Sequence, residues 1–149
     1  APKLVVCGTG PMEKWCREFA ESNNLNVEFK GFVQNAEVLK IVASSKALVL
    51  PTQWYEGFPM SIVEAFSVGT PVICSDLGNA GSIVEEKITG FKFQYNESDS
   101  LKCVIKEFES YDMKLLQQSA YGKYRRYFDQ NRNYEMIQAI YICIKENLQ

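Results

Sequence analysis

Apolar residues follow two different spacings along the chain, and the two spacings alternate. Short runs of aliphatic and β-branched residues predict strands at 3–7, 26–30, 47–51, 71–74 and 89–93. Between them, apolar residues recur at the spacing of one helix face around Trp15, Ala36 and Ile62, and a short helix is predicted at 82–85. This alternation predicts an α/β fold: a Rossmann-like, doubly wound parallel sheet with helices on both faces, followed by C-terminal helices.

Only helices are predicted beyond residue 97. Apolar residues recur at helical spacing along the last helix and form a stripe, which we expect to dock on the sheet. The segment 121–128 mixes basic and aromatic residues, and we interpret it as an amphipathic helix rather than a nucleic-acid-binding patch. The stripe of the last helix consists of Met136, Ile137, Ile140, Tyr141 and Ile144.

Four loops with candidate binding residues each follow the end of a predicted strand. They contain Gly8, Gly31, Glu56 and Gly78. In an open parallel sheet, the carboxyl ends of the strands lie along one edge, and ligands bind there. This arrangement favours a nucleotide-like ligand. A nicotinamide or flavin cofactor is not indicated, because Glu13 stands where the third glycine of Gly-x-Gly-x-x-Gly is required.

The stretch 54–66, Trp-Tyr-Glu-Gly-Phe-Pro-Met-Ser-Ile-Val-Glu-Ala-Phe, connects the third strand to a helix. Pro59 suits the first position of that helix, because its missing N–H would have no partner there. The backbone N–H groups of Met60, Ser61 and Ile62 would then point out of the helix N-terminus. They predict an anion site that is suited to a phosphate.

Two carboxylates, Glu56 and Glu64, bracket this site with seven residues between them. Because a carboxylate repels a phosphate, they are better suited to bind hydroxyl groups. Glu64 would otherwise be a solvated surface glutamate, whereas Glu56 lies in an aromatic, glycine-rich loop where no structural role requires a carboxylate. Trp54 and Tyr55 in that loop either stack on a sugar or pack the loop, and packing is the commoner role.

Composition narrows the possible roles of the chain. Its 149 residues suffice for one domain with a buried core, and a net charge of -2 argues against a nucleic-acid partner. There is no run of eighteen apolar residues and no signal-peptide pattern. The five cysteines show no Cys-x-x-Cys spacing, and there is no histidine. We therefore predict buried free thiols in a reducing cytosol and no metal site.

The motif Glu-x7-Glu occurs here within Trp-Tyr-Glu-Gly-Phe-Pro, followed by Glu-Ala and then by Gly-Thr-Pro-Val. In this setting it resembles the donor-binding signature of retaining GT-B glycosyltransferases, in their large family four. The resemblance runs from Leu4 to Phe93. It implies that Glu56, with Gly57 and Phe58, binds the transferred sugar.

The same resemblance implies roles for the remaining parts of a donor. Glu64 would bind the ribose, and the helix N-terminus formed by Pro59, Met60 and Ser61 would bind the diphosphate. The resemblance implies that the base is bound largely through backbone groups. The side chains at two of the matching positions, Val33 and Gln34, fit packing or solvent equally well. The residues of this base pocket would be Gly10, Gly31, Val33 and Gln34.

Some positions differ from the family's pattern. The family usually has Gly-Gly with a Glu three residues after the second Gly, and Asn79 and Ser82 occupy those places here. Lys87 stands where a glycine is common before Thr-Gly. We expect these differences to leave the fold intact and to alter the pocket on the sugar side.

The family's C-terminal domain starts one strand earlier, with an Arg and a Lys that neutralise the diphosphate, and no such strand or pair precedes Leu4. The resemblance therefore implies that residues 1–149 are the nucleotide-sugar (donor) binding domain. They would be a fragment of a larger two-domain enzyme, one half of a GT-B fold that lacks its first strand. The acceptor would bind the missing N-terminal domain. We expect the fragment to be inactive alone and assign no catalytic residue within it.

For the whole enzyme, the resemblance implies hexosyl transfer from a nucleoside diphosphate sugar to a growing glycan or lipid-linked sugar, in polysaccharide biosynthesis. It implies retention of anomeric configuration without a metal ion or other cofactor. The expected location is the cytoplasm, at the inner face of the membrane, with membrane contact only through the missing part. Two alternatives stay open. One is a sugar-nucleotide epimerase or phosphorylase on the same fold, and the other is a non-catalytic nucleotide-binding module.

Overall fold

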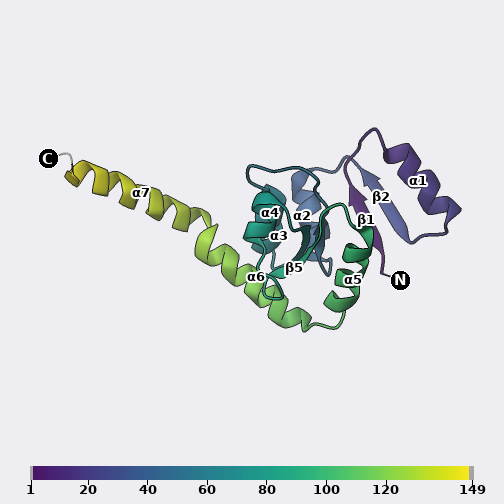
Figure 1. Ribbon diagram of the computed structural model, residues 1–149. Coiled ribbons are helices and arrows are strands. Elements are labelled where there is room, and N and C mark those ends of the chain that lie inside the picture. The colour runs from purple at the N-terminus through teal and green to yellow at the C-terminus, as the bar shows by residue number, and fades with distance from the viewer. Residues whose placement is uncertain (1, 148–149) are drawn as a thin grey trace. The chain divides into compact units, whose positions relative to one another are not determined.

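A computed structural model describes residues 2–147, in which strands and helices alternate up to the last strand (Figure 1). The chain forms two compact units that divide between Ile41 and Val42. In chain order the elements are β1 (Leu4–Cys7), α1 (Glu13–Ser22), β2 (Val27–Gly31), α2 (Asn35–Ala43), β3 (Leu48–Leu50), α3 (Met60–Ser67), β4 (Val72–Ser75), α4 (Gly78–Ile83), β5 (Gly90–Phe93), α5 (Ser98–Phe108), α6 (Met113–Tyr127) and α7 (Gln130–Asn147).

The first unit contains the parallel pair β1 and β2, with Leu4 opposite Val27. Gly8 follows β1 with a φ angle of 113°, and Gly31 is the last residue of β2 with a φ angle of 65°. Glycine adopts such positive φ angles without the steric cost that a Cβ brings. The Gly8 N–H donates to the Gly31 C=O at 2.6 Å. The turns after the two strands therefore lie side by side, as the sequence predicted.

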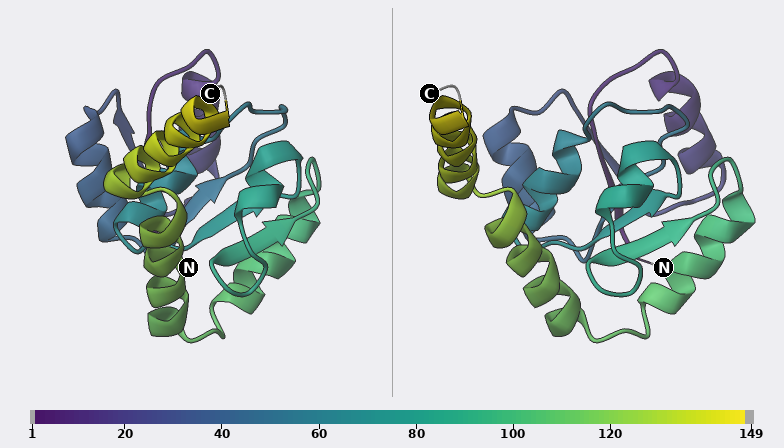
Figure 2. Two further views of the ribbon diagram at one scale, coloured as in Figure 1. Left: turned by 90° about the vertical axis from the view of Figure 1, so that its left-hand side faces the viewer. Right: turned by 60° about the vertical axis from the view of Figure 1, so that its left-hand side comes forward.

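The second unit contains a parallel sheet of β3, β4 and β5, with β4 in the centre. Every residue of β4 is buried, as expected for a strand that is covered on both faces. α3 and α4 cover one face, where Phe66 packs with Val72, and α5 covers the other, where Phe91 packs with Phe108. Figure 2 shows α4 and α5 on opposite sides of β5. The predicted α/β fold is confirmed.

Two positions at the start of β5 and in the turn before it have backbone surroundings that favour glycine. A Cβ built on Gly90 would overlap the Val72 carbonyl oxygen and lie 2.8 Å from its carbonyl carbon, so the strands leave no room for a side chain. Lys87 has a φ of 62°, in the left-handed region that glycine adopts most easily. Its Nζ lies 2.7 Å from Glu107 Oε1, and this hydrogen bond raises the pKa of the Lys87 amine.

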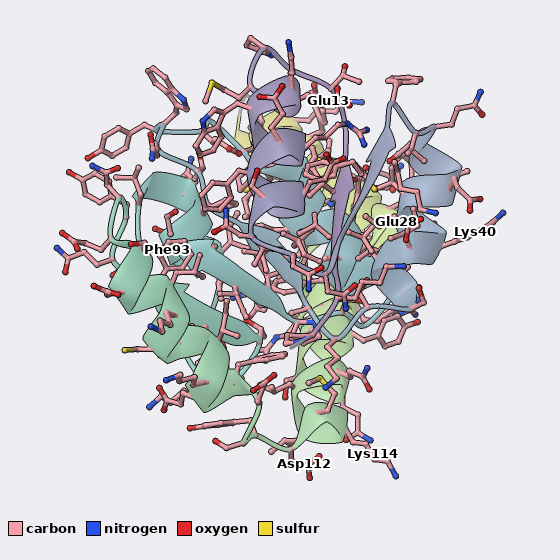
Figure 3. The ribbon with its side chains drawn as sticks, turned by 90° about the vertical axis from the view of Figure 1, so that its right-hand side faces the viewer. Glu13, Glu28, Lys40, Phe93, Asp112 and Lys114 are labelled. Atoms are coloured by element: carbon pink, nitrogen blue, oxygen red, sulfur yellow. The ribbon has the colours of Figure 1, made fainter. Side chains whose placement is uncertain are left out.

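Helix α6 begins at a capped N-terminus. The Asp112 carboxylate accepts a hydrogen bond from the Lys114 backbone N–H at 2.9 Å, which satisfies one of the amides of the first turn. Figure 3 labels both residues at this end of the helix. Further along, Tyr124 packs against the core while Arg125 is exposed. The interpretation of 121–128 as part of an amphipathic helix is therefore confirmed.

Helix α7 extends outward from the end of α6, away from the sheet of the second unit (Figure 1). Its apolar stripe is exposed, with 58% of Ile140 and 71% of Tyr141 accessible to solvent. The prediction that this helix docks on the sheet is wrong, because helical spacing identifies an apolar face without showing what covers it. Within residues 2–147, no helix has both the length and the apolarity that a membrane span requires.

The burial predicted for the cysteines holds for Cys74 alone. Cys7, Cys103 and Cys143 are exposed, and Cys16 is half-buried. The prediction failed because short apolar segments can lie at the surface as well as in the core. In β4, burial raises the pKa of the Cys74 thiol to about 12, because the thiolate would lose its hydration. This thiol therefore stays protonated and unreactive at neutral pH.

Candidate functional site at the carboxyl edge of the second sheet

Two loops meet at the carboxyl ends of neighbouring strands in the second unit. The loop 51–59 follows β3, and α4 follows β4 after a short turn. The Asn79 side chain joins them, because its Nδ2 donates to the Glu56 C=O at 3.1 Å and also to the Gly57 C=O. The prediction that Glu56 and Gly78 lie at one sheet edge is therefore confirmed, but Gly78 begins helix α4 and is not in a loop.

Helix α3 starts with amides that point out of its N-terminus. The helix begins at Met60, and Pro59 is the buried N-cap residue, one position earlier than predicted. The Ile62 N–H donates to the Pro59 C=O at 3.0 Å, so the prediction that this amide is open to an anion is wrong. The N–H groups of Met60 and Ser61 have no acceptor in the part of the chain that the structure describes. These two donors lie at the positive end of the helix dipole.

The two glutamates lie on either side of this helix N-terminus in sequence, and both are half-buried. Glu56 is in the loop before the helix. Glu64 is in its second turn, between the buried residues Val63 and Ala65. The buried residues of α3, among them Ile62 and Phe66, pack on the core, and Glu64 is not one of them.

Contacts at both ends hold the loop that carries Glu56. Near its start, the Gln53 Nε2 donates to the Asn96 Oδ1 at 3.1 Å. Near its end, the Phe58 and Phe128 rings meet edge to face with centroids 6.1 Å apart, a favourable geometry for aromatic rings. Phe128 follows α6, so the loop is tied to a helix far away in sequence.

The aromatic residues in the middle of the loop are largely in solvent. Trp54 is 80% exposed and Tyr55 is 82% exposed, so the expectation that Trp54 packs the loop is wrong. Tyr55 still touches α4, because a Cβ built on Gly78 would lie only 3.0 Å from its Cδ1. Gly78, with a φ of 54°, leaves the space that this ring occupies.

Helix α4 starts earlier in the sequence than predicted. The sequence Gly-Asn-Ala-Gly-Ser at 78–82 has low helix propensity, which favoured a loop. Instead the helix forms because Ala80 and Val84 are buried in the core beside β4. Ser82, which matches a glutamate of the family pattern, donates from Oγ to the Gly78 C=O at 3.0 Å within this helix.

The residues predicted to bind the base all belong to the first unit, whereas the sugar and diphosphate residues belong to the second. Gly10 is exposed and Val33 is half-buried. The Gln34 C=O accepts hydrogen bonds from the N–H groups of Glu37 and Val38, at the start of α2. Its backbone carbonyl is therefore engaged by the helix.

This site combines two N–H donors with two carboxylates, an arrangement suited to an anion that lies beside hydroxyl groups. Asn79 and Phe128 are the residues that sequence reasoning missed as parts of it. Asn79 was noted only as a departure from a pattern, and it lies 23 positions from Glu56. No group of three or more His, Cys, Asp or Glu side chains within residues 2–147 could hold a metal ion.

The family profile described as Glycosyl transferases group 1 matches residues 1–126. The chain belongs to this family. A relative of this group 1 chain is an uncharacterized glycosyltransferase of Methanocaldococcus jannaschii, 27% identical over 130 residues, which cover 82% of this chain and 33% of the relative. Another is UDP-Gal:alpha-D-GlcNAc-diphosphoundecaprenol alpha-1,3-galactosyltransferase of Escherichia coli, 26% identical over 112 residues, which cover 74% of this chain and 29% of the relative.

Solved structures share the fold of this group 1 chain. One is Anabaena HepE in complex with UDP-glucose, with a TM-score of 0.78 and 22% identity. The match covers 93% of this chain and 40% of the Anabaena chain. The group 1 chain thus spans about a third of the length of these curated relatives.

Proposed function

We infer that this chain binds a nucleoside diphosphate sugar and acts as the donor-binding half of a retaining glycosyltransferase. The observation that carries the proposal is the pair of unpaired amides at Met60 and Ser61, with the half-buried Glu56 and Glu64 on either side in sequence. The amides would bind the diphosphate. Membership of the group 1 glycosyl transferases supports the sugar-transfer chemistry.

Each side chain of the site has a proposed task. Glu56, with Gly57 and Phe58, would accept hydrogen bonds from hydroxyls of the transferred sugar, and Glu64 would accept them from the ribose. Carboxylates form strong charge-assisted hydrogen bonds with such donors. The base would bind in the first unit, at the pocket predicted from Gly10, Gly31, Val33 and Gln34.

Chemistry at this site would depend on stabilising negative charge. As the sugar–phosphate bond breaks through an oxocarbenium-like state, charge develops on the leaving diphosphate. The Met60 and Ser61 N–H groups are fixed donors at the α3 N-terminus, so they would stabilise this charge without reorganising. We propose that transfer retains the anomeric configuration and needs no metal ion or other cofactor.

UDP-sugars are the donors that the comparisons support. The Anabaena protein was solved in complex with UDP-glucose, and the Escherichia coli relative is named for UDP-Gal. The acceptor would be a growing glycan or a lipid-linked sugar, bound by an N-terminal domain outside this chain. The whole enzyme would work in the cytoplasm at the inner face of the membrane, which it would contact only through that other part.

Calorimetric titration with UDP and UDP-glucose tests the proposal. Because the chain spans only about a third of the length of its curated relatives, we expect weak binding, with a Kd on the order of 0.1–1 mM, equivalent to about 4–5.5 kcal/mol. Inorganic phosphate serves as a control for binding that requires the anion alone. The chain by itself should transfer no sugar. Sub-micromolar affinity, turnover by this chain, or no binding of either nucleotide would contradict the proposal.

A further inference from the structure

We propose that Asn79 is a positioning residue that fixes the backbone carrying Glu56, and thereby sets the affinity of the site for the donor sugar. This inference rests on the proposed function. The Asn79 Nδ2 donates to two successive carbonyl groups, those of Glu56 (3.1 Å) and Gly57. Neither carbonyl accepts another hydrogen bond among the residues that the structure describes.

A primary amide is suited to this contact, because its nitrogen carries two N–H groups. By donating to both carbonyls, Asn79 restrains the peptide planes on either side of Gly57. Gly57 needs that restraint, because it has no side chain and a Cβ built on it would meet nothing within 4 Å. A glycine without such contacts has the widest backbone freedom of any residue.

Nearby side chains give this part of the loop little support. Trp54 and Tyr55 are 80% and 82% exposed, so they bury little surface that would order the backbone. Glu56, in contrast, is half-buried. The side chain that prefers water is thus partly enclosed while its aromatic neighbours are not, which is the reverse of what burial alone produces.

Asn79 extends from a rigid support. The next residue, Ala80, is 1% exposed in the core of the second unit. After it, Gly81 approaches Asp76 so closely that an added Cβ would lie 2.6 Å from the Asp76 Oδ1 and 3.2 Å from its backbone. α4 is therefore packed closely against the turn that follows β4. Any restraint that Asn79 exerts on the loop is transmitted from the sheet.

The test compares Asn79→Ala and Asn79→Asp with Asn131→Ala, a control on the exposed helix α7. Asp keeps the shape of Asn, but it cannot donate and places a carboxylate against two carbonyl oxygens. Backbone ¹⁵N relaxation without ligand is the first readout. We expect the order parameters of Glu56, Gly57 and Phe58 to fall in both Asn79 variants, from about 0.85 for a rigid backbone toward about 0.6, and not to change in the control.

The second readout is the affinity for UDP and for UDP-glucose. If Asn79 positions Glu56, both substitutions should weaken the binding of UDP-glucose by about tenfold. They should change the affinity for UDP by no more than about twofold. If Asn79 were needed only for folding, its substitution would weaken the binding of both ligands alike. Unchanged order parameters at 56–58, or equal losses of affinity for the two ligands, would overturn the proposal.

The two proposals fail in different ways. If the unaltered chain binds neither UDP nor UDP-glucose, the proposed function is wrong, and the relaxation measurement still decides whether Asn79 holds the loop. If the unaltered chain binds both and the Asn79 variants bind like the control, the proposed function stands and the role of Asn79 is wrong.

Discussion

At the scale of single residues, the two glutamates of the site would bind different parts of one donor. Glu64→Gln should weaken the binding of UDP and of UDP-glucose alike, because both carry the ribose. Glu56→Gln should weaken the binding of UDP-glucose only, because plain UDP has no sugar beyond the diphosphate. A carboxylate hydrogen bond is worth about 1.5–3 kcal/mol, so each loss should be about tenfold or more. Calorimetry at fixed salt measures both, since the phosphate contacts are ionic.

Glu109→Gln is a matched control for this comparison, because Glu109 is exposed at the end of α5. Gln keeps the shape of Glu, so none of these changes should unfold the chain. If Glu56→Gln weakens plain UDP as much as Glu64→Gln does, then Glu56 does not bind the sugar.

Residues whose role follows from local chemistry could be predicted from the sequence. The roles predicted for Pro59 and for the amides after it depend only on a helix starting there. The spacing of Glu64 from Ile62 and Phe66 places it off the apolar face of that helix. Asn79 could not be recognised, because its contact with Glu56 spans 23 positions and no local pattern encodes it. A contact of this kind depends on two strands lying side by side in three dimensions.

At the scale of elements, the burial of α3 and the exposure of α7 predict opposite responses to the same substitution. Ile62 in α3 is 0% exposed and Ile140 in α7 is 58% exposed. Ile62→Ala should therefore reduce the free energy of unfolding by about 2–5 kcal/mol, through lost burial and a cavity. Ile140→Ala should change it by about 0.5 kcal/mol or less. Denaturant titration of the two variants measures both values.

If Ile140→Ala lowered the free energy of unfolding as much as Ile62→Ala does, α7 would be packed in solution. Sequence could predict that both helices form, because apolar spacing defines them. It could not distinguish their environments, because the period of a stripe carries no information about its partner. The start of α4 was missed for a related reason, since the packing of Ala80 overrides the weak helix propensity around it.

At the scale of the whole molecule, ligand binding should stabilise the chain and protect amides in each unit. With a Kd of 0.1–1 mM, about 10 mM UDP-glucose should raise the free energy of unfolding by about 1.4–2.7 kcal/mol. Hydrogen exchange should show protection at Met60 and Ser61 from the diphosphate, and at Gly31 and Val33 from the base. Protection confined to Val42–Gln149 would show that the predicted base pocket is wrong.

The architecture could be predicted because strands and helices alternate with clear periodicity, and parallel pairing follows from that alternation. Lys87 illustrates a finer limit. The resemblance marked this position as one where glycine is common, but only the structure gives the cause, a φ of 62° that a lysine adopts here. The backbone conformation, rather than ligand contact, explains the preference.

Gly90 extends this reasoning to evolution. The Val72 carbonyl excludes even a methyl group at this position, so selection on the sheet alone would keep a glycine there in any descendant of this chain. Invariance is easily taken as a sign of substrate contact, yet Gly90 begins β5, at the end of the sheet opposite the candidate site. Here invariance would record only the spacing of two strands. A lineage that lost the proposed donor binding but kept the fold should therefore retain Gly90 while Glu56 and Glu64 drift.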